Sequence, residues 1–290
     1  MSEHQPRKKK KKILIIGKGY IAKYIIKDTK KKFNTIFISR KKFSIKKKIN
    51  NIDVILHTIG LNRHASELKK KEAISVKKKY TQEIIKFAKL NKISKIIYFS
   101  SSLVYAKNIQ GKIDENTKCK NKESYAKHHL FAENLLKKYS GNDLKIIILR
   151  MGNVFGINNY QNNDNIYGIN KMILTAIRDK EVDVNFVKLE KNIIPIDHLI
   201  KIIPKLKFTQ NFKILNIYFK TLNLKEIAKL ISKRIKYLFN HKIKVNILKN
   251  GKSRKKLNFK SIYLKEKIYK KLIVKQIDSS LKIINKINIL

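Results

Sequence analysis

Two glycines and an alanine near the amino end of the chain have the spacing of a dinucleotide-binding turn. The six residues that begin at Gly17 read Gly-Lys-Gly-Tyr-Ile-Ala, the pattern G-x-G-x-x-A. In such a turn Gly17 permits a tight bend, Gly19 lets backbone amides approach a pyrophosphate, and small Ala22 lets the following helix pack on the preceding strand. Tyr20 and Ile21 open that helix. We assign all five residues to cofactor binding, although an ordinary glycine turn has the same letters.

A basic cluster stands where dinucleotide enzymes distinguish NAD from NADP. An NAD-preferring site usually presents Asp or Glu at the end of its second strand, whereas here Arg40 stands between Ser39 and two lysines. The guanidinium of Arg40 can bind the 2′-phosphate of NADP. We therefore assign Arg40 to cofactor binding and expect NADP or NAD, with NADP favoured. A solvated loop is the alternative interpretation in so lysine-rich a chain.

Residues that commonly bind metals are scattered along the chain. His57, His64 and Cys119 lack the paired spacing of a metal site, so we expect no metal. His57 is interpreted as a packing residue at the end of a strand.

The elements that would position the glycine turn form a βαβ unit. Residues 13–16 are an all-apolar run, typical of a strand buried on both faces of a parallel sheet. Residues 20–31 have apolar side chains at helical spacing, and residues 35–39 predict a second strand. This context favours a dinucleotide turn over an ordinary one.

The alternation of strands and helices continues beyond this unit. Further strands are expected at residues 53–57, 95–100 and 144–149, with helices at 73–90 and 125–139. Such alternation predicts an α/β protein with a Rossmann doubly wound parallel sheet.

The sequence changes character after Gly156, where a smaller C-terminal lobe is expected. Its expected elements are an Asn-rich loop at 158–165, helices at 170–180 and 224–235, and strands at 192–196, 213–219 and 242–248. We therefore expect three parts: a basic N-terminal tail at 1–12, an NAD(P)-binding Rossmann domain at 13–156, and a substrate-binding lobe at 157–290.

Length and composition predict a globular cytoplasmic protein. A chain of 290 residues with 43% hydrophobic residues can bury a sizeable core. Its single cysteine, Cys119, cannot form an internal disulfide, and the first residues do not resemble a secretory signal. No apolar run approaches the ~20 residues of a spanning helix, so no membrane insertion is expected.

The net charge of +49 raises the possibility of nucleic-acid binding. However, 62 of the 69 basic residues are lysine and only seven are arginine, the better phosphate reader. Lysine, isoleucine and asparagine, which all have A/T-rich codons, are abundant together, and the charge is spread along the whole chain. We therefore favour a base-composition bias over nucleic-acid binding.

Five segments carry a more specific resemblance: residues 53–57, 97–105, 125–133, 149–156 and 193–198. Their order and intervals resemble the NAD(P)-dependent nucleotide-sugar epimerases, dehydratases and reductases among the extended short-chain dehydrogenases. The likeness spans residues 13 to about 286. It implies an oxidoreductase that reduces or epimerises a nucleotide-activated sugar, in the manner of enzymes of surface polysaccharide synthesis.

The resemblance assigns catalytic roles to three residues. Ser101, four residues before Tyr105, takes the place of the family's oxygen-orienting serine or threonine. Tyr125 takes the place of the tyrosine acid/base, which the chemistry needs because hydride transfer at a sugar carbon also moves a proton on its oxygen. His129 stands where the family has a lysine that contacts the nicotinamide ribose and lowers the tyrosine pKa. Because a histidine is mostly neutral at pH 7, turnover is expected to be slow, of higher pH optimum, or absent.

The resemblance also has other departures and consequences. Dehydration is not expected, because Ser102 and Leu103 replace the acidic pair that follows the active-site threonine in family dehydratases. Residues 41–52 lack the acidic residue that commonly contacts adenine. Asp197 begins a helix after a late strand, as an N-cap or a ligand contact. The family commonly dimerises through helices that correspond here to residues 73–90 and 125–139, so we expect a homodimer.

Two alternatives from other functional classes remain at this point. One is a cofactor-binding sensor or scaffold without turnover, which the missing lysine favours. The other is an RNA-binding protein on a Rossmann frame, which the charge favours.

Overall fold

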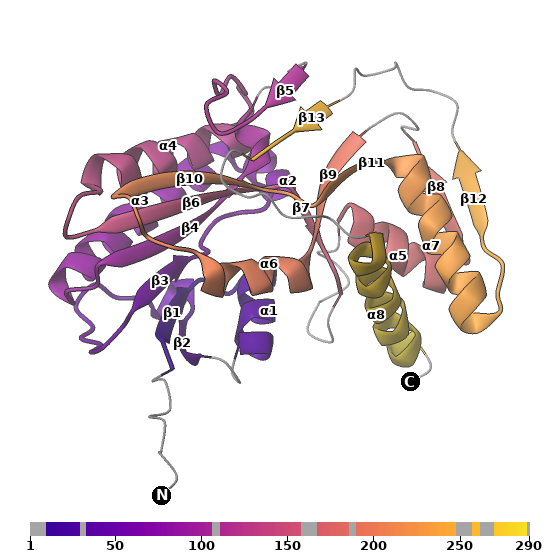
Figure 1. The fold of residues 1–290 in the computed structure, drawn as a ribbon, viewed down its shortest axis with the longest axis horizontal. Coiled ribbons are helices and arrows are strands. Elements are labelled where there is room, and N and C mark those ends of the chain that lie inside the picture. Colours follow the sequence, from indigo (N-terminus) through magenta and orange to yellow (C-terminus); the bar gives the residue numbers. More distant parts are fainter. Residues whose placement is uncertain are drawn as a thin grey trace, which may run out of the picture. The chain divides into compact units, whose positions relative to one another are not determined.

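The computed structural model describes residues 10–29, 33–105, 111–157, 167–185, 190–247, 257–261 and 270–288. Its central sheet has six parallel strands in the order β10-β6-β4-β3-β1-β2 (Figure 1). These strands are β1 (Lys12–Ile16), β2 (Asn34–Ile38), β3 (Val54–His57), β4 (Lys95–Ser101), β6 (Lys145–Met151) and β10 (Phe212–Ile217). The predicted Rossmann sheet is confirmed.

The first βαβ unit forms as its apolar pattern predicts. Strand β1 pairs in parallel with β2 on one side and with β3 on the other. Helix α1 (Tyr20–Thr29) joins β1 to β2. The side chains of β1 from Ile13 onward are all buried, because a central strand covered on both faces has no solvent side.

The chain divides into two compact units. Unit 1 comprises Met1–Phe99, Phe131–Ile148 and Phe208–Lys213, and unit 2 comprises Ser100–Leu130, Leu149–Lys207 and Ile214–Leu290. The helices that accompany the first strands are α2 (Arg63–Leu68), α3 (Lys70–Leu90) and α4 (Ser124–Tyr139). Helix α3 buries one face at helical spacing, with Ala73, Lys77, Thr81 and Ile84 along it.

Three helices of unit 2 pack against one another: α5 (Ile169–Arg178), α7 (Leu224–Phe239) and α8 (Lys270–Asn288). A capping box between Asn223 and Glu226 starts α7. The guanidinium of Arg234 on α7 holds both carboxylate oxygens of Asp278 on α8 at 2.7 and 2.8 Å. Helix α8 was not expected from the sequence.

The remaining strands form small sheets. Their order is β11-β9-β7, β12-β8 and β13-β5. The strands are β5 (Gly111–Ile113), β7 (Asn153–Phe155), β8 (Glu181–Val184), β9 (Glu190–Pro195), β11 (Lys220–Asn223), β12 (Lys244–Ile247) and β13 (Leu257–Phe259). The Asn-rich loop expected at 158–165 and most of the basic tail lie outside the described residues.

The expectation for Asp197 is wrong in one respect. The strand expected at 192–196 ends at Pro195, because Ile196 begins helix α6 (Ile196–Ile202) and Pro195 occupies the N-cap position. Asp197 therefore lies inside the first turn of α6, where its backbone N–H donates to Gln276 Oε1 at 3.1 Å. An N-cap role is excluded for Asp197.

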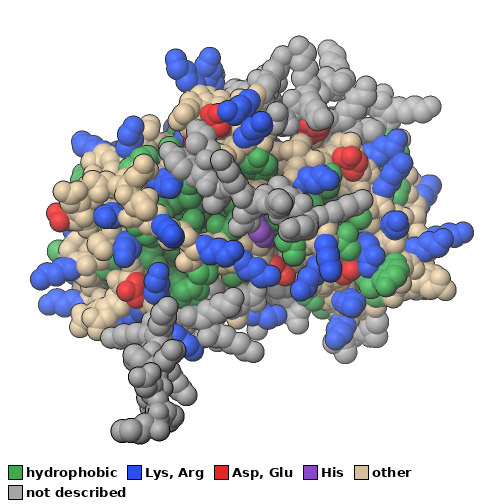
Figure 2. Space-filling view, viewed as in Figure 1, with side chains coloured by type: hydrophobic (Ala, Val, Ile, Leu, Met, Phe, Trp, Pro, Cys, Tyr) green, Lys and Arg blue, Asp and Glu red, His purple; other side chains and the backbone are tan. Residues whose placement is uncertain are grey.

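The charged side chains are dispersed on the face of the molecule that Figure 2 draws. Figure 2 shows lysine and arginine side chains scattered over the visible face, with few acidic side chains among them. None of the helices in the described part of the chain is both long enough and apolar enough to cross a membrane.

Candidate active site

The glycine turn lies in unit 1, directly after β1. Gly17 has a φ of +125°, a backbone conformation that side chains rarely tolerate, and a Cβ there would meet the hydroxyl of Thr58. Its N–H donates to the carbonyl of Ile38 at 2.9 Å, and the N–H of Thr58 donates to that of Ile16 at 3.0 Å. Only glycine fits at position 17, between the ends of β2 and β3.

The other positions of the turn fit a pyrophosphate. A Cβ at Gly19 would meet nothing within 4 Å, so the backbone at that position is open to a ligand. The first turn of α1 carries no acidic side chain, and a helix N-terminus favours anions. Ala22 is fully buried against the sheet, whereas Tyr20 and Ile21 are partly exposed. The residues present therefore suit the phosphates of a dinucleotide.

Arg40 lies at the neighbouring strand end. Ile38, the last residue of β2, pairs with Ile16, the last residue of β1. A single 3-10 turn at Arg40–Lys42 follows, and Arg40 in it is partly exposed. Gly17, the first residue after β1, and Arg40, the second residue after β2, therefore lie at the same edge of the sheet.

His57 is a buried packing residue at the end of β3. Its Nε2 lies 3.1 Å from the hydroxyl of Thr81, and its ring centroid lies 4.9 Å from that of Tyr98. Burial, with a smaller contribution from Lys77, lowers the pKa of His57 well below its usual value, so the ring is neutral. No group of metal-binding side chains occurs among the described residues.

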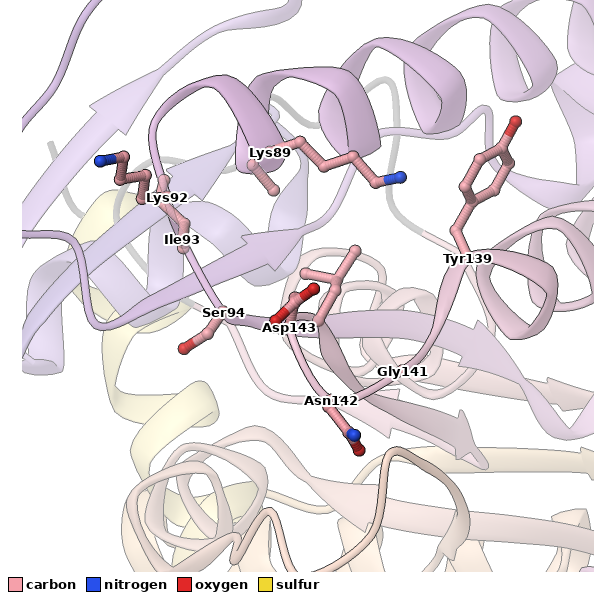
Figure 3. Close-up of a pocket in the computed structure, with 10 residues that line it drawn as sticks. Lys89, Lys92, Ile93, Ser94, Tyr139, Gly141, Asn142 and Asp143 are labelled. Carbon is pink, nitrogen blue, oxygen red and sulfur yellow. The ribbon is translucent and has the colours of Figure 1, made fainter.

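A surface cavity of about 640 Å³ in unit 1 lies away from the glycine turn (Figure 3). Residues 92–94 and 141–144 contribute to its lining and precede the first residues of β4 and β6. Lys89 and Tyr139 also line it, with the Lys89 Nζ 5.0 Å from the Tyr139 ring centroid. Because the glycine turn follows the carboxyl end of β1, this cavity belongs to the opposite edge of the parallel sheet. It is not the cofactor site.

Ser101, Tyr125 and His129 all belong to unit 2. Ser101 ends β4, is 8% exposed, and accepts a hydrogen bond from the N–H of Leu103 at 3.2 Å. A hydroxyl has one proton to donate in addition to its lone pairs. The bond from Leu103 therefore orients the Ser101 oxygen and leaves its proton for another acceptor.

Tyr125 and His129 lie side by side on α4. Their ring centroids are 4.7 Å apart with the planes at 66°, the edge-on contact that a spacing of four residues on a helix permits. His129 is 5% exposed, and Tyr125 is half-buried. His128 lies at 5.2 Å from Tyr125 and completes a cluster of three rings.

Tyr105 is the centre of a buried polar network that the sequence did not predict. Its hydroxyl donates to Asn216 Oδ1 at 2.8 Å and accepts from Arg150 Nη1 at 2.9 Å. Burial raises the pKa of Tyr105 to about 12, although Arg150 and Asn216 oppose the change. Because Tyr105 is buried and its hydroxyl is engaged by both Arg150 and Asn216, we assign it a structural role and keep Tyr125, which the resemblance indicates, as the candidate acid/base. The resemblance included Arg150, in the segment 149–156, but gave no sign of its partner.

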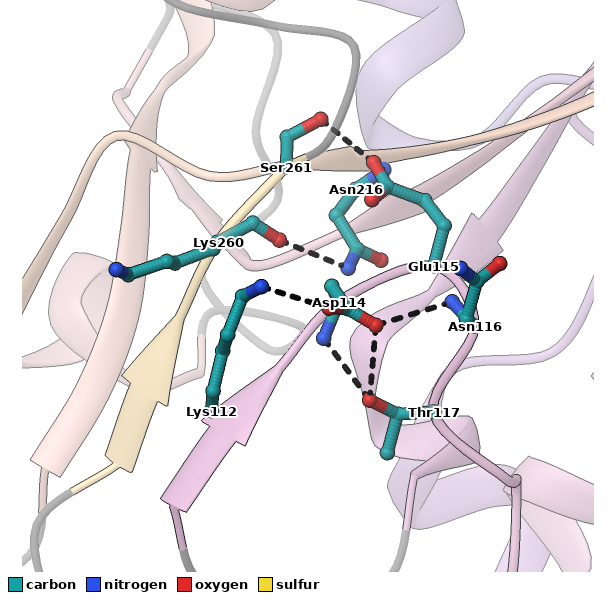
Figure 4. Close-up of polar contacts among 8 residues, drawn as sticks. All are labelled: Lys112, Asp114, Glu115, Asn116, Thr117, Asn216, Lys260 and Ser261. Carbon is teal, nitrogen blue, oxygen red and sulfur yellow. Dashed lines mark hydrogen bonds and ion pairs between the residues drawn. The ribbon is translucent and has the colours of Figure 1, made fainter.

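The carboxylate of Glu115 extends this network (Figure 4). Its Oε1 accepts from the backbone N–H of Asn216 at 2.8 Å and from the Ser261 hydroxyl at 2.5 Å. Nearby, β5 pairs with β13, and the ring of Phe259 lies 5.8 Å from that of Tyr105. The network therefore connects four segments of unit 2 that are remote in the sequence, at residues 105–115, 150, 216 and 261.

The sheet order and the glycine turn define a Rossmann-type α/β protein. The sequence profile of the NAD dependent epimerase/dehydratase family matches residues 7–188, so the chain belongs to that family. The expected dependence on a nicotinamide cofactor agrees with this family. No curated protein shows significant similarity to the chain.

Solved structures of low sequence identity share the fold. A UDP-N-acetylglucosamine 4-epimerase from Methanobrevibacter ruminantium, in complex with UDP-N-acetylmuramic acid, has 18% identity and a TM-score of 0.81 over 97% of this chain and 100% of its own. A UDP-glucuronic acid 4-epimerase from Bacillus cereus, with UDP-glucuronic acid and NAD, has 18% identity and a TM-score of 0.73 over 95% and 99%. The RMD protein from Pseudomonas aeruginosa, complexed with NADPH, has 12% identity and a TM-score of 0.71 over 94% and 99%.

Proposed function

We propose that the protein is an NAD(P)-dependent oxidoreductase that epimerises or reduces a nucleotide-activated sugar at a ring carbon, in cytoplasmic polysaccharide synthesis. One observation carries the proposal: Tyr125 is packed edge-on against His129 in the same unit as the oriented hydroxyl of Ser101. The UDP-sugar and NAD complexes of the structural neighbours support the substrate class. The family of the chain supports the cofactor.

Each of the three residues has a distinct task in this proposal. Tyr125 moves the proton of the sugar hydroxyl, since its phenol is the protonatable group that packs on His129. Ser101, whose oxygen accepts from Leu103, donates its hydroxyl proton to the same sugar oxygen and so orients the sugar. His129 holds the Tyr125 ring and contacts the nicotinamide ribose. A bound nicotinamide supplies the hydride acceptor or donor.

We assign dinucleotide binding and sugar binding to the two domains expected from the sequence. Residues 13–156 hold the dinucleotide and residues 157–290 hold the sugar, with residues 1–12 as a basic tail. The open backbone at Gly19 and the helix end at Tyr20 support the first assignment. The second rests on the resemblance alone.

The proposal is tested by turnover. Purified protein is incubated with a panel of nucleotide-linked hexoses and each dinucleotide, and the products are separated and identified by mass spectrometry and NMR. An epimer or a reduced sugar supports the proposal. A dinucleotide that binds but never changes redox state supports a sensor or scaffold instead. Binding of RNA that persists at moderate salt concentration supports an RNA-binding protein.

Arg40→Ala is expected to weaken NADP binding by about tenfold or more while NAD affinity changes little, because a charge-assisted contact contributes about 1.5–3 kcal/mol. Only NADP carries the 2′-phosphate. Titration calorimetry with both dinucleotides measures the ratio of affinities. Lys42→Ala, an exposed cation of the same 3-10 turn, is the matched control. An unchanged ratio in Arg40→Ala would remove the NADP preference.

His129→Lys is expected to preserve or raise turnover near neutral pH and to move the basic-side dependence of the rate to lower pH. A protonated lysine beside Tyr125 favours the tyrosinate, whereas a neutral imidazole does not. A pH and rate profile measures the change, with Lys127→Ala as a control on an exposed position of the same helix. A fall in turnover would instead indicate a site shaped around the imidazole.

A homodimer is also expected from exposed apolar side chains on the two helices that the resemblance assigns to dimerisation. On α3 Leu90 is 70% exposed and Ile74 38%, and on α4 Phe131 is 36% exposed. Light scattering at micromolar concentration should give twice the chain mass of 34.1 kDa. Phe131→Lys should lower that mass, and a monomeric wild type would contradict the expectation.

A further inference from the structure

A lysine is buried in unit 1 without an anion. Lys77 lies in the middle of α3 and is 1% exposed. Its Nζ donates to the carbonyl oxygen of Ile59 and lies 5.0 Å from the centroid of the Tyr98 ring. None of the described carboxylates forms an ion pair with it. An ammonium has three protons to donate, so a single carbonyl and an aromatic face satisfy it only in part.

Burial of an ammonium without a counter-charge lowers the stability of the folded protein. A buried cation normally has a counter-charge, because the interior repays little of its lost hydration. A methionine in the same place would bury the same aliphatic length without that cost. An uncompensated cation of this kind is a candidate for a functional site.

The ammonium of Lys77 contacts the loop that follows β3 and borders the glycine turn. A Cβ at Gly60 would lie 2.6 Å from the Lys77 Nζ, so the ammonium abuts the backbone of the 58–60 loop. The same loop also approaches the turn, because a Cβ at Gly17 would lie 3.0 Å from the Ile59 nitrogen. The 58–60 loop is therefore a close neighbour of both the buried ammonium and Gly17, the first residue of the turn proposed to hold the pyrophosphate.

We propose that Lys77 is the buried counter-charge of the dinucleotide site, and that it takes up a proton when an anionic pyrophosphate binds at the neighbouring glycine turn. This inference rests on the cofactor site of the proposed function. In the free protein, burial lowers the pKa of Lys77 to about 7. A bound anion stabilises the ammonium and so raises that pKa. Protons and dinucleotide then favour each other's binding by the same factor.

The direction of the pH dependence follows from these two states. Below about pH 7 Lys77 is charged in both states, and dinucleotide affinity does not depend on its titration. Above that pH the free protein loses the proton and the complex keeps it. Affinity therefore falls by up to about tenfold for each pH unit, until the pKa of the complex is reached.

Other titratable groups around Lys77 do not account for such a change. On β3 the facing group is His57, whose pKa lies well below its usual value, so it is neutral throughout this range. On β4 it is the phenol of Tyr98, whose ring the ammonium faces. Helix α2, which also packs against α3, carries Arg63, His64 and Glu67. Only the carboxylate of Glu67 could pair with an ammonium, and no ion pair joins it to Lys77 among the described residues. Burial alone lowers the pKa of Lys77.

The experiment is calorimetric titration of the full chain with NAD, which lacks a titrating 2′-phosphate. Titrations at about pH 8 in two buffers of different ionisation enthalpy give the number of protons bound with the ligand. The wild type should take up more than about half a proton. Lys77→Met, and Lys77→Gln as a second variant, should take up none and should bind NAD at least about tenfold more weakly near pH 6.5. Lys78→Met, an exposed neighbour, should behave as wild type.

The outcomes separate this inference from the proposed function. If the wild type binds NAD without taking up a proton, the role of Lys77 is overturned and the cofactor site stands. The same conclusion follows if both Lys77 variants still take up a proton when they bind NAD. If neither NAD nor NADP binds the wild type at millimolar concentration, the proposed function itself fails and the inference fails with it.

Discussion

Tyr125→Phe is expected to lower turnover of the nucleotide sugar by about 10²–10⁴-fold, the usual contribution of a positioned acid/base. The substitution removes only the phenolic oxygen. The ring remains to pack on His129 at the present centroid distance of 4.7 Å, so the fold and the dinucleotide affinity should not change. Steady-state rates with the best sugar of the panel, together with NAD titration, measure both quantities.

The control for this variant is Tyr139→Phe, which removes the same oxygen from an exposed tyrosine at the end of the same helix. It should leave turnover unchanged. Full activity of Tyr125→Phe would show that the proton moves through another group. Tyr105 is a poor substitute for that role, because burial raises its pKa to about 12 and its hydroxyl is engaged by Arg150 and Asn216.

Gly19→Asp is expected to weaken dinucleotide binding by at least ~100-fold while the protein stays folded. The new carboxylate would face the pyrophosphate, and like-charge contacts of this kind cost several kcal/mol. The fold should tolerate the change, since a Cβ at position 19 meets nothing within 4 Å and aspartate is a favoured residue immediately before a helix. Titration calorimetry and thermal unfolding measure the two effects separately.

Gly141→Asp is the matched control for Gly19→Asp. A Cβ at Gly141 also meets nothing within 4 Å, and this glycine lines the cavity at the opposite edge of the sheet. The same carboxylate there should leave dinucleotide affinity unchanged. Equal affinities of Gly19→Asp and wild type would place the cofactor elsewhere.

Five strands of the central sheet (β1, β2, β3, β4 and β6) could be predicted from their apolar residues, whereas β10, expected as a strand of the C-terminal lobe, pairs beside β6 in the same sheet. Ile13 to Ile16 are all buried, so their identity alone shows a strand that is covered on both faces. The ends of the strands were harder to predict from the sequence. Pro195 and Ile196 continue the apolar run of β9, yet the chain turns there into α6, and nothing local distinguishes the two states.

The polar contacts of the site could not be predicted in the same way. Strands β5 and β13 have three residues each and pair across a long stretch of sequence, so neither has a pattern of its own. The hydrogen bond from Tyr105 to Asn216 likewise joins residues 111 positions apart. Single-sequence periodicity carries no information on which remote polar groups meet.

The burial of Lys77, unlike these polar contacts, is indicated by the helical spacing of its neighbours in the sequence. It stands four residues from Ala73 and from Thr81, on the face of α3 that the apolar pattern turns inward. In a chain with 62 lysines, one more lysine at an inward position is easily taken for a solvated one. Only the packing of α3 against β3 and the 58–60 loop reveals its place beside the glycine turn.

Transfer of a hydride between a nicotinamide and a sugar carbon is followed with deuterium. Nucleotide sugars that carry deuterium on the ring carbons are incubated with the protein and NAD or NADP, and unlabelled keto forms of the sugars are incubated with the protein and NADH or NADPH that carries deuterium on the nicotinamide. Both the sugar and the dinucleotide are analysed by mass spectrometry and NMR. We expect deuterium to pass between the sugar and the dinucleotide, or an epimer that retains it at the inverted carbon, and we expect both products to be strongly reduced in Tyr125→Phe. Tight dinucleotide binding with no deuterium transfer and no altered sugar across the panel would contradict the proposed function.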